Sequence, residues 1–169
     1  EHWDKKLWRE DLDRMLANGI HTIRIGEFAW NKVEPREGEF TFDFFDDFLE
    51  VVAQTEMKVI FGTPTATPPA WLTDKYPEVL NCRIDGVKYR HGMRRHYNYN
   101  SKVYRELSAR IVGKFGEHYA PHKSVIGWQI DNEINCGTAE FYSDSDTLAF
   151  REFLKKKYGT LEELNKAWG

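Results

Sequence analysis

Two acidic positions of this 169-residue chain have the residue types and spacing for acid–base chemistry. Asp131-Asn132-Glu133 directly follows the apolar run 124–130, and Glu27 follows the β-branched run 22–26. Both runs are predicted strands, and α/β proteins place catalytic groups at the carboxyl ends of parallel strands. Paired carboxylates on one rim, with aromatic rings beside them, suit glycosidic bond cleavage, in which one carboxyl group donates a proton. The alternatives are a surface turn for the first segment and a helix-capping or ion-paired side chain for Glu27.

Two more segments carry residue types that bind ligands or shape a site. Arg94-Arg95-His96-Tyr97 offers guanidinium groups, which hold carboxylates and vicinal hydroxyls in fixed geometry. The segment 63–71 follows a predicted strand and contains three prolines, which lower the entropy cost of a fixed loop shape. The alternatives are a solvated basic patch and a rigid connection without a ligand, and the residues alone favour the basic patch for the first segment.

Hydrophobic periodicity predicts the elements that position these residues. Apolar side chains at three- and four-residue spacing predict helices, and short β-branched or continuous apolar runs predict strands. Ser101 is expected to cap the third helix, and Thr160 and Glu163 are expected to form a capping box for a short last helix after Gly159. The predicted helices span 8–20, 44–57, 101–119 and 147–158, and the predicted strands span 22–26, 58–63 and 124–130.

The alternation of these elements predicts the fold class. Helices and strands follow one another in strict order, which is typical of right-handed βαβ units and of an α/β fold with a parallel sheet. The segment 64–100 is predicted as a long functional loop with at most one helical turn, near 70–76.

Composition and charge exclude several classes of function. With 41% hydrophobic and 30% charged residues, the chain is expected to form one globular unit, neither disordered nor membrane-embedded. The 24 basic and 27 acidic residues give a net charge of -3, so neither nucleic acid nor an anionic membrane is an expected partner. Cys82 and Cys136 form no C-x-x-C pattern and the histidines show no metal-binding spacing, so no metal or cofactor is expected. The same cysteine usage predicts a reducing compartment, the cytoplasm.

Four segments carry a family resemblance: Arg24–Trp30, Gly62–Leu72, Arg94–Tyr97 and Trp128–Glu133. Together they resemble the glycoside hydrolase family 42 β-galactosidases, and the resemblance runs over nearly the whole chain. The Asn-Glu pair is shared by a large clan of barrel glycosidases, whereas the Thr-Pro-Thr-Ala-Thr-Pro-Pro stretch is much more specific.

The resemblance implies a (β/α)8 TIM-barrel glycosidase that releases terminal β-D-galactose from β-galactosides with retention of configuration. In that family the Glu after Asn at the end of strand four is the general acid/base, which falls on Glu133. By the same resemblance, Asn132 binds the sugar 2-hydroxyl and Arg94 binds the sugar in the same subsite.

The resemblance also predicts the domain organisation. Residues 1–169 are expected to be the N-terminal part of a single (β/α)8 catalytic domain, covering about strands two to four. Strand one and strands five to eight, with the nucleophilic Glu of strand seven, are expected to lie outside this chain. The expected partners are a β-galactoside and the remaining half of the barrel, and the fragment alone is expected to be inactive. The cysteine set of the zinc-binding members is not matched, because Asn98 follows Tyr97 and Cys136 is the one cysteine after Glu133.

Two alternatives stay open at this point. One is a barrel glycosidase of the same clan that acts on another β-glycoside, and the other is a non-catalytic half-barrel that assembles with a partner. The natural substrate and its linkage, the role of Glu27 and association of the parent into a homo-oligomer also stay open.

Overall fold

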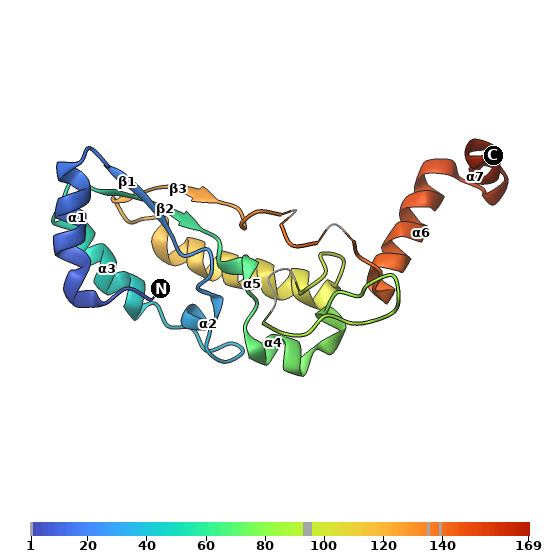
Figure 1. Ribbon diagram of the computed structural model, residues 1–169, viewed down its shortest axis with the longest axis horizontal. Coiled ribbons are helices and arrows are strands. Elements are labelled where there is room, and N and C mark those ends of the chain that lie inside the picture. The colour runs from blue at the N-terminus through green and yellow to red at the C-terminus, as the bar shows by residue number, and fades with distance from the viewer. Residues whose placement is uncertain (1, 93–95, 135, 139) are drawn as a thin grey trace.

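The computed structural model describes residues 2–92, 96–134, 136–138 and 140–169, and its centre is a three-stranded parallel sheet (Figure 1). The strands lie side by side in the order β1 (Thr22–Ile25), β2 (Lys58–Gly62) and β3 (Val125–Gln129). The register pairs Ile25 with Phe61 and Gly62 with Gln129, so the carboxyl ends of all three strands meet at one edge. The predicted α/β fold with a parallel sheet is confirmed, and the residues that follow the strands share that edge.

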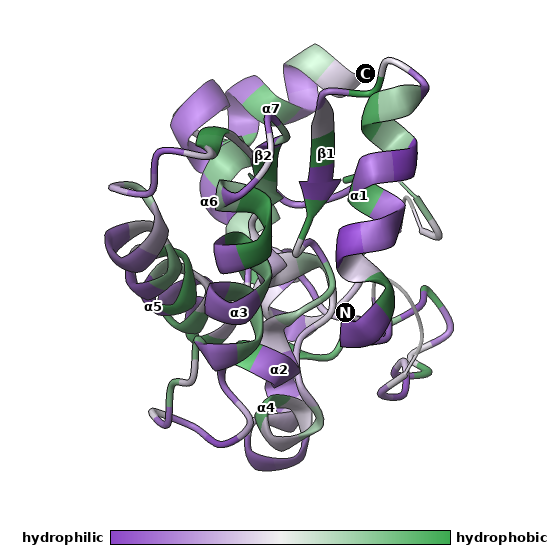
Figure 2. Cartoon of the chain, turned by 90° about the vertical axis from the view of Figure 1, so that its left-hand side faces the viewer, coloured by the Kyte–Doolittle hydropathy of each residue, from purple (hydrophilic) through white to green (hydrophobic). Residues whose placement is uncertain are grey.

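Three long helices connect and cover the strands. They are α1 (Trp8–Ala17) before β1, α3 (Asp43–Ala53) between β1 and β2, and α5 (Lys102–Tyr119) between β2 and β3. Each mixes hydrophobic and hydrophilic residues along its length (Figure 2), and the buried residues recur at helical spacing, as do Leu107, Ile111 and Phe115. Ser101 caps α5 as predicted, because its Oγ accepts a hydrogen bond from the Tyr104 N–H.

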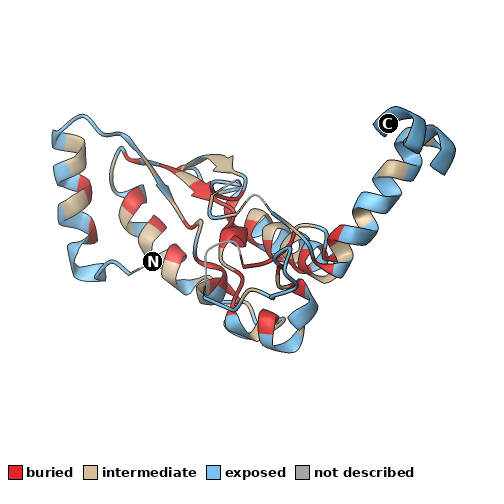
Figure 3. Ribbon diagram, turned by 45° about the vertical axis from the view of Figure 1, so that its right-hand side comes forward, coloured by how far each residue is buried: buried red, intermediate tan, exposed pale blue. Residues whose placement is uncertain are grey.

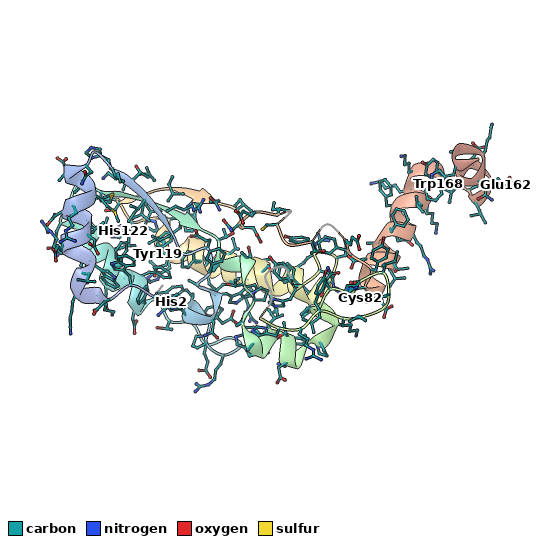
Figure 4. All side chains as sticks on the ribbon, viewed as in Figure 1. His2, Cys82, Tyr119, His122, Glu162 and Trp168 are labelled. Atoms are coloured by element: carbon teal, nitrogen blue, oxygen red, sulfur yellow. The ribbon has the colours of Figure 1, made fainter. Side chains whose placement is uncertain are left out.

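The core mixes aliphatic and aromatic side chains and is centred on β2. Val59 and Phe61 are fully buried, whereas β1 and β3 are more exposed because each has a strand on one side only (Figure 3). The ring centroid of Phe61 lies 4.8 Å from that of Phe115 and 4.7 Å from that of Tyr119, which is labelled in Figure 4. Full burial of one such ring contributes about 1.5–3 kcal/mol to stability. Many of the aromatic side chains of this chain therefore lie in the core or pack against it.

The connecting segments hold more helical structure than the sequence predicts. The segment 64–100 contains α4 (Ala70–Lys75) and two 3-10 turns, Pro64–Ala66 and Pro77–Val79. Each 3-10 turn opens with a proline, whose fixed φ and missing N–H fit the first helical position. A one-turn helix, α2 (Trp30–Val33), lies where the sequence predicts none, and its Trp30 and Val33 are buried in the core.

The C-terminal helices α6 (Asp144–Tyr158) and α7 (Leu161–Trp168) extend away from the sheet (Figure 1). The start of α6 lies earlier than the predicted residue 147, because Ser143 and Asp146 form a reciprocal capping box. Thr160 Oγ1 accepts from the Glu163 N–H, which is one of the two bonds of the predicted capping box of α7. Several large apolar side chains of these two helices are exposed: Leu148, Phe150, Phe153, Leu161 and Trp168.

Candidate active site

The Asn132-Glu133 turn lies at the carboxyl edge of the sheet, shortly after β3. Asn132 is 6% exposed whereas Glu133 is exposed, so a buried amide precedes a carboxyl group that a ligand can reach. The φ angles of Asp131 and Glu133 are 55° and 46°, a left-handed conformation that residues other than glycine rarely adopt. The surroundings must therefore stabilise this turn.

Side chains of the segment after β2 supply that stabilisation. Thr63 Oγ1 accepts a hydrogen bond from the Asp131 N–H at 2.7 Å, and Thr65 Oγ1 donates to Asp131 Oδ2 at 2.8 Å. Asp131 Oδ1 accepts from the Asn132 N–H at 2.6 Å. The proline-rich segment 63–71 is thus joined directly to the turn that carries Asn132 and Glu133.

Glu27 lies at the same edge, after β1, and two glycines bring its backbone close to β2. Gly26 has a φ of 95°, which turns the chain at the end of the strand. A Cβ added at Gly62 would lie 2.7 Å from Glu27 Cβ and 3.0 Å from Glu27 Cα, so a larger residue there would push Glu27 away. The Glu27 side chain is 13% exposed, and its Oε1 lies 3.1 Å from Arg24 Nη2. Glu27 is therefore an ion-paired carboxylate on the rim.

Arg24 and Gln129 connect Glu27 to the turn after β3. Arg24 Nη1 donates to Gln129 Oε1 at 2.6 Å. Gln129 Nε2 donates to the Asp131 carbonyl at 2.8 Å and, over a longer 3.4 Å, to Asn132 Oδ1. Because Asn132 Oδ1 is an acceptor here, its Nδ2 group is the donor that remains for a ligand hydroxyl.

The strand order separates Glu27 from Glu133. They follow β1 and β3, which β2 keeps two inter-strand spacings apart, about 9.6 Å. The two carboxyl groups of a retaining glycosidase are about 5–5.5 Å apart. This separation and the ion pair with Arg24 favour a binding or structural role for Glu27 over that of nucleophile.

Tyr104 of α5 supports the threonine segment from the core. Its hydroxyl donates to the Thr65 carbonyl at 3.1 Å, and its ring stacks on Tyr97 with centroids 4.4 Å apart. Burial raises the pKa of Tyr104, and the charge of Asp131 raises it further. Tyr104 therefore stays protonated at neutral pH and keeps its hydrogen bond to the threonine segment.

The structure describes some of the other residues that the sequence analysis named, but not all of them. Arg94, the predicted sugar-binding arginine, lies outside the described residues, although His96 and Tyr97 of the same motif are buried. Within the described ranges, no three His, Cys, Asp or Glu side chains gather to hold a metal ion. Cys82, labelled in Figure 4, and Cys136 are free thiols. No helix in the described part of the chain has the length and apolar character to cross a membrane.

Four side chains of this rim lie inside the segments that the sequence analysis singled out, but it assigned none of them a role: Arg24, Gln129, Thr63 and Thr65. A signal was available for the first two, because Arg24 lies between two isoleucines of β1 and Gln129 is the one polar side chain of β3. The roles of the threonines depend on Asp131, which is 68 and 66 positions away. No local pattern carries that information.

A parallel sheet with acidic and amide groups at its carboxyl edge defines an α/β protein of the kind that includes barrel glycosidases. A sequence profile of glycoside hydrolase family 42, described as beta-galactosidase, matches residues 1–169, and the chain belongs to this family. The chain is 47% identical to "Beta-galactosidase BgaA" of a Thermus species, over its full length and 26% of that protein.

Solved structures show the same likeness in three dimensions. The β-galactosidase from the psychrophilic Marinomonas ef1 matches with a TM-score of 0.95 and 45% identity, over 99% of this chain and 26% of that one. The polyextremophilic β-galactosidase from Halorubrum lacusprofundi matches with a TM-score of 0.95 and 42% identity, over 100% of this chain and 25% of that one. The three-stranded sheet is therefore part of a (β/α)8 barrel, and the chain spans about a quarter of the length of the relatives it matches.

Proposed function

We propose that the complete protein containing these residues is a retaining glycoside hydrolase that releases terminal β-D-galactose from β-galactosides. In this proposal the chain is the N-terminal part of a single (β/α)8 catalytic domain, with β1, β2 and β3 as barrel strands two to four. Support comes from the family membership and from identities of 40–47% to proteins named as β-galactosidases. The two free cysteines support a reducing compartment such as the cytoplasm.

The single observation that carries this proposal is the turn after β3, where the buried Asn132 precedes the exposed Glu133 at the catalytic edge of the fold. Glu133 is the proposed general acid/base, which protonates the leaving group and then activates water. Asn132 is the proposed ligand of the sugar 2-hydroxyl, through its Nδ2 group. Arg94 is the proposed second sugar ligand.

The proposed nucleophile comes from the remaining half of the barrel. Glu27 is another acidic side chain at this edge of the sheet, and its distance from β3 and its pairing with Arg24 make it a poor candidate. The remaining half-barrel and a β-galactoside are therefore the proposed partners. The isolated chain lacks the second carboxyl group that hydrolysis with retention needs.

The substrate is tested with the complete protein and a set of nitrophenyl glycosides. We expect a higher kcat/KM for the β-galactoside than for the β-glucoside, β-mannoside or arabinoside. A preference for a sugar other than galactose or its close analogues would contradict the galactosidase assignment and favour another specificity within the same clan.

A non-catalytic assembly unit is the second candidate function. The observation that favours it is the exposed apolar surface of α6 and α7, together with the open edges of β1 and β3. Sedimentation of the isolated chain separates the two cases. A monomer at high concentration would count against self-assembly, whereas a stable oligomer would support it.

A further inference from the structure

The hydrogen bonds around Asp131 close into a ring that the proposed catalytic roles do not use. The Asp131 N–H donates to Thr63 Oγ1, the two threonine hydroxyl oxygens lie 3.4 Å apart, and the Thr65 O–H donates to Asp131 Oδ2. Because the Thr65 hydrogen is directed to the carboxylate, the Thr63 hydroxyl is the donor between the threonines. In these three residues, called here the threonine–aspartate ring, the Asp131 N–H and the two threonine hydroxyls therefore each have one acceptor.

The ring is buried and is attached to the scaffold on two sides. Thr63 is 2%, Thr65 6% and Asp131 7% exposed, so water competes little for these hydrogen bonds. The Thr65 carbonyl accepts from the Tyr104 hydroxyl of α5 at 3.1 Å, and the Thr63 N–H donates to the Gln129 carbonyl of β3 at 2.8 Å. These two bonds fix the backbone of Thr63 and Thr65, so their side chains can stabilise the turn at 131–133.

The turn itself requires such support. Asp131 and Glu133 have positive φ angles, which side chains larger than glycine adopt at a cost unless their surroundings fix them. The ring holds both the N–H and the carboxylate of Asp131, and the carboxylate in turn accepts from the Asn132 N–H. The path from the ring to Glu133 is thus a short stretch of constrained backbone.

We propose that the threonine–aspartate ring is a positioning device that sets where the Glu133 carboxyl group lies relative to the glycosidic oxygen. The inference rests on the proposed function, because it gives the ring an effect on proton donation. Thr63, Thr65 and Asp131 act through Glu133 and are positioning residues. A displacement of about 1 Å in a proton donor can lower a rate about 100-fold.

The test uses the complete protein with two pairs of variants. Thr63→Val and Thr65→Val keep the side-chain shape and remove the hydroxyl, whereas Thr63→Ser and Thr65→Ser keep the hydroxyl. Thr67→Val is the matched control, because the buried Thr67 Oγ1 has no hydrogen-bond partner in the part of the chain that the structure describes. The measurement is kcat/KM for an alkyl β-galactoside, which needs a proton donor, and for dinitrophenyl β-galactoside, which does not.

We expect each Val variant to lower kcat/KM for the alkyl galactoside about 10- to 100-fold and for the dinitrophenyl galactoside less than about threefold. The Ser variants and Thr67→Val should stay close to the wild-type protein on both substrates. In a Glu133→Gln background, Thr63→Val should add no further loss on the alkyl substrate, since its effect passes through Glu133.

Several results would overturn the inference. An equal loss on both substrates, Ser variants as impaired as Val variants, or a Thr63→Val effect that persists without Glu133 would each assign the ring a general structural role. If Thr63→Val does not fold, Thr65→Val tests the inference instead, because it removes a bond to a carboxylate and leaves the Asp131 N–H paired. The quantity compared is again the loss of kcat/KM on the alkyl galactoside relative to the loss on the dinitrophenyl galactoside.

The same assay separates this inference from the proposed function. In one outcome, Glu133→Gln loses activity on the alkyl substrate alone, whereas the Val variants lose activity on neither substrate or on both equally. That outcome would support the proposed function and reject the positioning role of the threonine–aspartate ring. A wild-type protein that cleaves no nitrophenyl glycoside would reject both.

Discussion

The buried carboxylate of Glu34 gives the sharpest prediction about stability. Glu34 is fully buried, and three donors converge on its two oxygens. The Trp30 indole N–H donates to Oε2 at 2.9 Å, the Gly38 N–H donates to Oε1 at 2.8 Å, and the Arg110 guanidinium forms an ion pair with Oε1. The Glu34 carbonyl also accepts from the Trp71 indole at 2.9 Å. This one residue therefore joins α2, α4, α5 and the loop between α2 and α3.

Glu34→Gln keeps the size of the side chain and exchanges one acceptor for an NH2 group. Whichever way the amide turns, at least one buried donor then faces another donor. Arg110 also loses the nearer of its two carboxylate partners and keeps Glu37, whose Oε1 lies 3.8 Å from Arg110 Nη1. A hydrogen bond to a charged group contributes about 1.5–3 kcal/mol, and an orphaned buried donor costs about 1–3 kcal/mol. Breaking one side of a fully buried ion pair costs about 3–5 kcal/mol, and because the Arg110 side chain is 32% exposed we expect a cost near the lower end, about 3 kcal/mol. A loss of 1 kcal/mol lowers Tm by roughly 2–4 °C in a protein of about 150–250 residues and by less in a longer one, so we expect the apparent Tm of the complete protein to fall by about 2–6 °C.

Thermal unfolding of the complete protein, followed by circular dichroism, measures this loss. Glu39→Gln is the matched control, because Glu39 pairs with Arg36 at 2.9 Å on the surface, where both side chains are more than half exposed. A surface pair of this kind contributes about 0–1 kcal/mol. A Glu34→Gln variant whose Tm falls no further than that of Glu39→Gln would refute the reasoning.

Three further predictions concern the core, the pH dependence and the isolated chain. Phe61→Ala removes a fully buried ring from the centre of the sheet and should cost about 3–5 kcal/mol; an apparent Tm no lower than the wild-type value would contradict this. Hydrogen bonds from Lys75 and then Tyr76 lower the pKa of Glu37 below its usual 4.5, so its contribution to stability is present above that pH and disappears as the pH falls further. The Tm difference between wild type and Glu37→Gln should therefore shrink on acidification, and a constant difference would oppose this view. The isolated 169-residue chain should show no galactosidase turnover and should bind galactose with a Kd in the millimolar range or weaker, roughly 4 kcal/mol or less. Activity that survives purification and disappears in Glu27→Gln would instead make Glu27 the nucleophile.

The sheet and its main helices are predictable because their signals are local. Apolar spacing along α5, such as Leu107, Ile111 and Phe115, reports directly which face is buried, and Ser101 marks the start of that helix. The run 124–130 is apolar enough to predict β3, and its position places Glu133 at the carboxyl edge. These predictions needed no knowledge of distant contacts.

The parts that the sequence does not predict depend on partners far along the chain. Glu34 is one of 27 acidic residues, and its ion-pair partner Arg110 lies 76 positions away. Asp131 is read locally as a turn residue, although its carboxylate is bound by Thr65, 66 positions earlier. Burial of a polar group is decided by whether donors from other elements reach it, which a single segment does not reveal.

The most direct test of the central claim is the leaving-group dependence of Glu133→Gln in the complete protein. If Glu133 is the general acid/base, kcat/KM for an alkyl β-galactoside should fall about 100- to 10,000-fold, because general acid catalysis contributes that much. For dinitrophenyl β-galactoside the fall should stay below about tenfold, since a good leaving group departs without a proton. An equal loss on the two substrates would contradict the assignment of Glu133.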